Sequence, residues 1–303
     1  MKVGYYPGCS LTGGSREYHE SVVALAKAFD VELVQIPDWN CCGSTAAHNL
    51  NKTLSLSLPA RNLGLAEKNG LDEIVVPCAA CYNRLTTTQN ELNHDKKLRE
   101  DISGVIGMPL GGNTEILNVI QFMQKYILPS IPEKTKKPFS FNVACYYGCL
   151  LVRPQKEVKF DRAEDPMSMD EIAAAAGARP VEWPFKTECC GAGLTMSRTD
   201  TVARLSGKIV REALERKAEA IVVACPMCQS NLDMRRPEIN RMTGMKLDIP
   251  VIYITQLVGL AAGLDKKELG LQRHFVPFRL RPVTETADAE ANEIVKTKNP
   301  TEV

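Results

Sequence analysis

Residues 72–85 read DEIVVPCAACYNRL, and residues 219–232 read EAIVVACPMCQSNL. In each stretch a short β-branched run stands directly before a C-x-x-C motif. A run that is apolar at successive positions indicates a strand buried on both faces of a parallel sheet. Because the two stretches share this plan at the same offsets, they predict two copies of one structural unit.

The repeat extends well beyond these stretches. The first copy begins with YYPGCSL (5–11) and VELVQIPDWNCCG (31–43), and the second with CYYGCLL (145–151) and ARPVEWPFKTECCG (178–191). The CC pair and the following C-x-x-C motif are separated by nearly equal lengths of chain in the two copies. The cysteines therefore align as Cys9 with Cys149, Cys41–Cys42 with Cys189–Cys190, and Cys78/Cys81 with Cys225/Cys228.

Strands and helices are expected to alternate along both copies. Apolar runs predict strands at 2–6, 32–36, 141–144 and 251–254, while amphipathic patterns predict helices at 53–70 and 200–218. This alternation predicts an α/β fold with parallel sheets, built as a pseudo-symmetric pair of domains. Each cysteine motif follows a predicted strand, and each C-x-x-C opens a helix. Distant cysteines of one copy should therefore meet at the carboxyl edge of one sheet.

The charged segment EKTKKP (133–138) marks the predicted boundary between the domains. We expect a first domain at 1–138, which ends in a connecting helix near 114–128, and a second domain at 139–280. Residues 281–303 lack apolar periodicity, so a flexible tail is expected there.

Composition narrows the functional classes. The 303 residues are 44% hydrophobic and 24% charged with a net charge of +1, which disfavours nucleic acid or a membrane surface as partner. The longest uncharged apolar stretch, 249–264, is too short to span a bilayer, and the N-terminus MKVGYYPGCS lacks the apolar core of a secretory signal. These features predict a cytoplasmic protein.

The five cysteines of each copy allow three interpretations. Disulfides are disfavoured by the reducing compartment and by the odd total of eleven cysteines. Zinc in one of the copies is an alternative, although an adjacent Cys-Cys pair is an awkward chelate for one tetrahedral ion. Iron–sulfur clusters accept thiolates at several irons. A cubane 4Fe–4S cluster binds four thiolates, and each copy supplies five. The fifth suggests a cluster in which one sulfur bridges two irons.

A lone cysteine, a CCG tripeptide and a C-x-x-C motif, present twice, resemble the CCG-domain family over about residues 1–260. Two copies with no other module are similar to the B subunit of heterodisulfide reductases, in the bacterial-type form that PDWNCCG and VPCAACYNRL indicate. The resemblance implies two Rossmann-like domains related by a pseudo-twofold axis, each with a non-cubane 4Fe–4S cluster. The implied ligands are Cys9, Cys41, Cys42, Cys78 and Cys81, and then Cys149, Cys189, Cys190, Cys225 and Cys228.

The same resemblance implies an oxidoreductase subunit that reduces or forms a disulfide, with a small disulfide or sulfur compound as substrate. No ferredoxin run or flavin fingerprint is found in the sequence, so electrons should come from other polypeptides. By resemblance these are the ferredoxin-like C subunit and the flavin-bearing A subunit of the same complex. The alternative is a non-catalytic electron relay, as in lactate, glycerol-3-phosphate or succinate oxidoreductase systems.

A few further residues are candidates for a substrate pocket between the domains. Gly43 and Gly191 follow the CC pairs, where a glycine permits positive φ or a close approach to a cluster. His48 is a candidate proton donor, and Arg84 or Arg153 could bind an anionic group. Cys145 has no counterpart in the first copy. It is either a small buried residue at a strand end or a sixth thiol near the second cluster.

Overall fold

The computed structural model describes residues 1–44 and 47–279, with only the backbone of His48. The first copy forms a four-stranded parallel sheet in the order β2-β1-β3-β4. The second forms another parallel sheet in the equivalent order β6-β5-β7-β8. The strands are β1 (Lys2–Tyr5), β2 (Glu32–Gln35), β3 (Glu73–Val76), β4 (Glu115–Asn118), β5 (Asn142–Tyr146), β6 (Arg179–Pro180), β7 (Ala220–Val223) and β8 (Val251–Tyr253).

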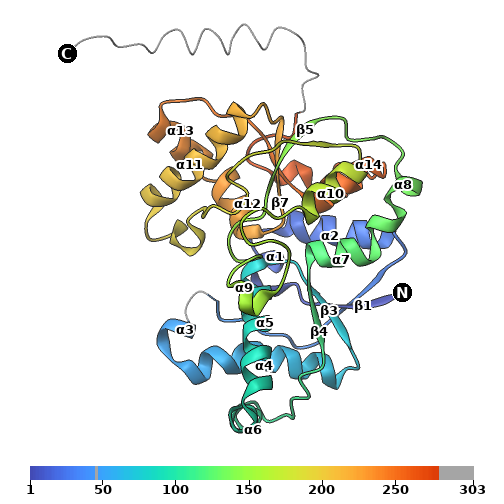
Figure 1. The fold of residues 1–303 in the computed structure, drawn as a ribbon, viewed down its shortest axis with the longest axis vertical. Helices are drawn as coiled ribbons and strands as arrows, with labels where there is room; N and C mark the ends of the chain where they lie inside the picture. The colour runs from blue at the N-terminus through green and yellow to red at the C-terminus, as the bar shows by residue number, and fades with distance from the viewer. Residues whose placement is uncertain (45–46, 280–303) are drawn as a thin grey trace, which may run out of the picture.

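Helices connect the strands in both halves (Figure 1). The first half contains α1 (Gly8–Thr12), α2 (Arg16–Ala28), α3 (Ala47–Leu50), α4 (Lys52–Lys68), α5 (Ala79–His94), α6 (Lys96–Ile106), α7 (Val119–Tyr126), η1 (Leu128–Ser130) and α8 (Ile131–Lys134). The second contains α9 (Gln155–Val158), α10 (Ser168–Ala175), η2 (Ala192–Thr195), α11 (Thr199–Glu215), α12 (Pro226–Asp233), α13 (Arg236–Thr243), α14 (Ile254–Ala261) and η3 (Leu271–Arg273). The predicted α/β fold with two tandem parallel sheets is confirmed.

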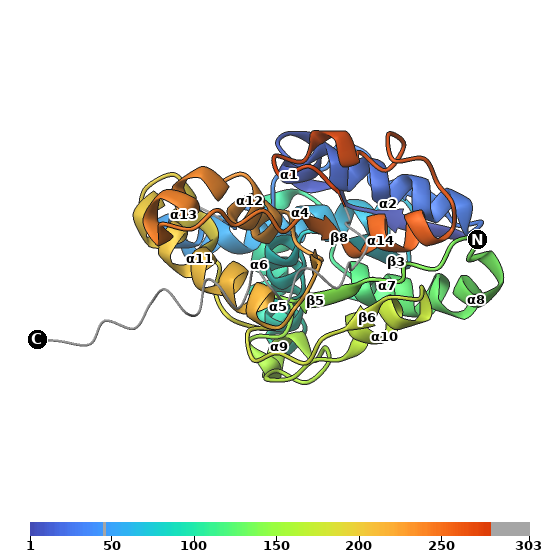
Figure 2. The same ribbon diagram turned by 90° about the horizontal axis from the view of Figure 1, so that it is seen from above.

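Four helices pack between the two sheets. Helix α2 lies against α14, and α7 lies against α10, so each pair joins one half of the chain to the other (Figures 1 and 2). Ile74, Val75 and Val76 of β3 are fully buried, as are the equivalent residues of β7. The apolar core is continuous through both halves, so the two sheets belong to one packed body.

The predicted helix near 114–128 is wrong in its first part. Residues Glu115–Asn118 form β4, which pairs in parallel with β3, and helix α7 begins only at Val119. The Asn118 side chain accepts hydrogen bonds from the backbone N–H groups of Ile120 and Gln121. This cap favours a helix start at that point, so the segment before it is free to complete the sheet.

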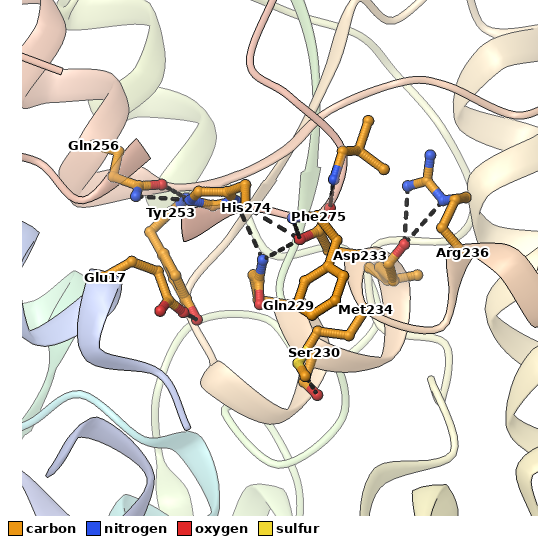
Figure 3. Close-up of polar contacts among 12 residues, drawn as sticks. Glu17, Gln229, Ser230, Asp233, Met234, Arg236, Tyr253, Gln256, His274 and Phe275 are labelled. Carbon is orange, nitrogen blue, oxygen red and sulfur yellow. Dashed lines mark hydrogen bonds and ion pairs between the residues drawn. The ribbon is translucent and has the colours of Figure 1, made fainter. Parts of the chain in front are cut away.

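The two domain boundaries remain a prediction, and the expected tail at 281–303 lies outside the described residues. Residues 265–279 fold back over both halves. The buried carboxylate of Asp233 accepts hydrogen bonds from the backbone of Phe275 (Figure 3) and from that of Val276. Arg273 pairs with Glu20 of α2 in the first half. In the described part of the chain, none of the helices has the length and apolar character needed to cross a membrane.

Candidate metal centre

All ten repeated cysteines lie at the carboxyl edges of the two sheets, as the sequence predicts. Cys9 follows β1 and lies in α1, the Cys41–Cys42 pair follows β2, and Cys78 follows β3 as the N-cap residue of α5. In the second half, Cys225 is likewise the N-cap residue of α12. Both C-x-x-C motifs therefore open a helix, whose first N–H groups favour thiolate charge.

In the first half, the thiols lie in close pairs. The sulfurs of Cys9 and Cys41 are 3.7 Å apart, and those of Cys42 and Cys81 are 3.2 Å apart. Cys9 and Cys41 are exposed, whereas Cys42, Cys78 and Cys81 are buried. This first cysteine group, made of these five residues, is thus open to solvent on one side and enclosed by the protein on the other.

The second cysteine group comprises Cys149, Cys189, Cys190, Cys225 and Cys228, and it repeats this plan. The sulfurs of Cys190 and Cys228 are 3.8 Å apart, and the Cys149 thiol contacts that of Cys189. Cys189 is exposed and Cys149 is half-buried, while the other three are buried. The open side again carries the lone cysteine and the first residue of the CC pair.

Glycines allow the chain to pass close to the sulfurs. Gly8 and Gly148, each directly before the lone cysteine, have φ of +65° and +68°. A Cβ atom on Gly148 would lie 2.9 Å from the Cys228 sulfur, too close for a normal contact. Gly43 and Gly191 also have positive φ, +74° and +96°, which confirms the conformation expected after each CC pair.

A buried tyrosine lies among the sulfurs of each group, and sequence analysis missed both. The Tyr6 hydroxyl donates to the carbonyl of Asn40 at 2.7 Å, and Tyr146 donates to that of Glu188 at 2.6 Å. Both acceptors directly precede a CC pair. Burial and the neighbouring thiols raise the pKa of both tyrosines, so they are neutral donors. The sequence contains a signal for both tyrosines, because each stands three residues before the lone cysteine of its copy.

The two cysteine groups adjoin at Cys78 and Cys225, whose thiols shift each other's pKa in opposite directions, upward for Cys78 and downward for Cys225. These residues occupy equivalent positions in the two copies. Between the same loops, the hydroxyl of Tyr18 lies 3.4 Å from the carbonyl of Pro77 and 3.2 Å from that of Ala224. Its ring stacks on Tyr253 with 3.8 Å between centroids. Tyr18 therefore ties the two C-x-x-C loops together, and this role was also missed.

The thiols influence one another strongly. The pKa of Cys42 is lowered to about 3, chiefly by the hydrogen bonds from Cys41 and Cys81. The pKa of Cys189 is lowered to about 6, chiefly by the contact with Cys149. Backbone N–H groups also point at the sulfurs, for example that of Gly191 at 3.4 Å from Cys189. The groups therefore contain preformed sites for thiolates, which are the form that binds metal.

The donors in both cysteine groups are all sulfur. In the first group four of the five sulfurs form two close pairs, and Cys78 is the fifth. Within residues 1–44 and 47–279, no three His, Cys, Asp or Glu side chains are arranged to hold one metal ion. Iron–sulfur clusters offer several irons that each take a thiolate, and five thiolates from one group fit such a cluster in their chemistry.

Cys145 and Arg153 are described, whereas the side chain of His48 is not. Cys145 is fully buried in β5, and burial raises its pKa, in agreement with the interpretation as a small core residue. Arg153 pairs with Glu164 at 2.8 Å and with the Thr187 hydroxyl at 3.3 Å. The side chain of His48 lies outside the described residues. A cavity of about 630 Å³ beside β2 is lined by other residues, so the predicted substrate pocket remains a prediction.

The fold resembles that of a solved structure, a hypothetical protein from Helicobacter pylori. The TM-score is 0.72 with 12% sequence identity, over 92% of this chain and 53% of that one. The chain thus spans about half the length of that protein. At this identity the likeness concerns the fold alone.

Two curated relatives match over almost their full length. The chain is 30% identical to a protein named 8-methylmenaquinol:fumarate reductase membrane anchor subunit from Wolinella succinogenes, over 90% of this chain and 96% of that one. It is also 30% identical to the B subunit of the ferredoxin/F420H2-dependent CoB-CoM heterodisulfide reductase from Methanosarcina acetivorans, over 91% and 94%. The family model of the cysteine-rich CCG domain matches residues 3–86 and again 143–233. The chain therefore belongs to the CCG family of cysteine-rich domains and carries two copies of that domain.

Proposed function

We propose that this chain is the iron–sulfur catalytic subunit of a heterodisulfide-reductase-like complex. Each cysteine group would hold one non-cubane 4Fe–4S cluster through its five thiolates. The observation that carries the proposal is that one hydroxyl, that of Tyr18, bonds to the carbonyls directly before Cys78 and Cys225, one from each group. Because the two groups adjoin, one small disulfide could reach both.

When bound, the two clusters would supply the two one-electron steps that the reduction of a disulfide to two thiols requires. The protein's own contribution is to hold both sites in a fixed relation. Tyr18 bonds to the carbonyls that precede Cys78 and Cys225, and it is fully buried. The exposed residues Cys9 and Cys189 lie on the open sides of the groups, where a substrate can approach.

A second function is favoured by the relative from a fumarate reductase. In this relay function, the chain passes electrons to a partner on which the substrate reacts. Both functions place the chain in a larger complex, since both relatives are named as subunits. For the reductase function, the proposed partners are a ferredoxin-like protein and a flavin-bearing protein that deliver electrons.

The metal content tests the ligand assignment. Anaerobically purified protein should contain about eight irons per chain with matching acid-labile sulfide. Cys42→Ala and Cys190→Ala should each lose about half of the iron, because each change removes a ligand from one group only. Cys145→Ala is the matched control and should keep all of it. A chain with four irons and one zinc would contradict the symmetric assignment.

Single-turnover reactions separate the two functions. The purified chain is reduced chemically and mixed with the CoB-CoM heterodisulfide or with glutathione disulfide, without any partner. If the chain is a reductase, the disulfide should reoxidise it, and two thiols should be released for every two electrons that the chain loses. A chain that stays reduced with both disulfides, but is reoxidised by a purified partner protein, would favour the relay function.

A further inference from the structure

The two cysteine groups are built alike but differ in charge at equivalent positions, and at two of these the charge has no ion pair among the described residues. Three residues after the last cysteine, the first copy has Arg84 where the second has Asn231. Directly before the CC pair, the first copy has Asn40 where the second has Glu188. Both differences make the surroundings of the first group more positive than those of the second.

Arg84 faces the first group from α5. It lies three residues after Cys81, hence on the same face of the helix, and the Cys81 sulfur is 3.2 Å from that of Cys42. Its Nε atom is buried without a hydrogen-bond partner, and its guanidinium forms no ion pair among the described residues. Within the described part of the chain, the cation is therefore not neutralised by a carboxylate.

Asn231 occupies the equivalent place at the second group and is neutral. Its amide Nδ2 lies 3.4 Å from the Cys190 sulfur and 3.1 Å from the carbonyl of Ala192. This direct contact shows that a side chain at this helix position reaches the second residue of the CC pair. Arg84 occupies the equivalent helix position in the first copy, three residues after Cys81.

Glu188 contributes the opposite charge at the second group. It is exposed, and it directly precedes Cys189, the first cysteine of the pair. Its counterpart Asn40 is uncharged and donates to the carbonyls of Cys41 and Leu58.

Asp38 and Lys186, each three residues before the CC pair, also differ in charge, and with the opposite sign, but both are in ion pairs. Lys186 forms ion pairs with Asp170 and Asp165, and Arg61 pairs with Asp38. The charges sum to zero for Asp38 with Arg61 and to −1 for Lys186 with its two aspartates, so these pairs do not reverse the difference that Arg84 and Glu188 make.

We propose that Arg84 and Glu188 make the two sites unequal, so that the site of the first cysteine group accepts an electron before the site of the second. The inference rests on the proposed function, because it requires a cluster at each group. Reduction adds one negative charge, which a nearby cation stabilises and a nearby carboxylate opposes. Arg84 should have the larger effect, since Glu188 is exposed to solvent and salt. An electron that reaches the second site then moves to the first, which is reduced as the second is oxidised.

The test is a potentiometric titration of the iron-loaded protein, followed by electron paramagnetic resonance. Cys190→Ala and Cys42→Ala each leave one site, which assigns the two midpoint potentials. The potential of the first site should be the higher. Arg84→Gln should lower it by at least a tenfold change in the reduction equilibrium, about 59 mV for one electron. Arg84→Lys keeps the charge and should retain most of the wild-type value. Glu188→Gln should raise the potential of the second site by a smaller amount.

Two results would overturn the inference. One is an Arg84→Gln protein with full iron content whose first-site potential is unchanged, or shifts no more than that of the second site. The other is a Glu188→Gln protein, altered only at an exposed position, whose second-site potential does not rise. Failure of the proposed function looks different. A chain without iron would refute both proposals, whereas potentials in the expected order without disulfide reduction would refute only the catalytic one.

Discussion

Asp233 should hold the C-terminal segment 265–279 onto the rest of the molecule. Its carboxylate is fully buried and accepts three hydrogen bonds, from the backbone N–H of Phe275 at 2.8 Å, that of Val276 at 2.9 Å and the Gln229 amide at 3.0 Å. Asp233→Ala would leave these donors buried without an acceptor. The network around His274 would lose its carboxylate as well (Figure 3).

The expected cost follows from these three bonds. A hydrogen bond to a charged group contributes about 1.5–3 kcal/mol, but neighbouring losses do not add fully. We therefore expect Asp233→Ala to lower the free energy of opening the segment by about 3 kcal/mol. Since every 1.4 kcal/mol is a factor of ten, amide exchange in 270–279 should become faster by on the order of 10².

Hydrogen–deuterium exchange with mass spectrometry measures this directly on the full chain. Glu20→Gln is the matched control, because it removes the ion pair of Arg273 from the same segment. That pair is solvent-exposed, so its loss should cost at most about 1 kcal/mol. If Asp233→Ala changed exchange in 270–279 no more than the control does, the segment would be held by its apolar contacts and the reasoning would be refuted.

Three other perturbations have definite expected outcomes. Tyr18→Phe leaves two buried carbonyls without their donor, so urea unfolding should show a loss of about 1–3 kcal/mol, and an unchanged midpoint would count against the bridging role. Gly148→Ala forces a Cβ to within 2.9 Å of the Cys228 sulfur and should reduce iron content by about half, whereas Gly14→Ala, which adds a Cβ in open space, should retain it. Burial lowers the pKa of His274 below its ordinary value of about 6.5. As pH falls, His274 is therefore protonated at a higher pH in the unfolded chain than in the folded chain. Stability should therefore decrease from pH 7 to pH 5, and the decrease should be smaller in His274→Gln.

The order of elements and the position of the cysteines could be predicted because both depend on local signals. The runs EIVV and AIVV are β-branched and apolar, and each became a central buried strand, β3 or β7. The helix predicted at 53–70 ends as expected, with Asn69 as C-cap residue and Gly70 at φ +66°. The repeat itself then determined which cysteines are equivalent.

What the sequence could not predict depends on contacts between distant residues. β4 was missed because EILN is short and precedes a strong helix, and only its pairing with β3 makes it a strand. The bond from Tyr18 to the carbonyl of Ala224 joins residues 206 positions apart. Neither the pairing of α2 with α14 nor the proximity of the two cysteine groups has a local signature.

The proximity of Cys78 and Cys225 has a geometric cause in the duplication. In an arrangement with twofold symmetry, a residue can adjoin its own counterpart only at the axis. Since these cysteines are counterparts in the repeat and the carbonyls before them bond to one hydroxyl, the pseudo-twofold axis passes between them. The same argument explains why Tyr18 occurs once. Its hydroxyl reaches the carbonyls of Pro77 and Ala224, which are also counterparts, so the hydroxyl lies at the axis. At the axis there is room for one such side chain and not for two. The chain is therefore forced to be asymmetric at the point where its two halves meet.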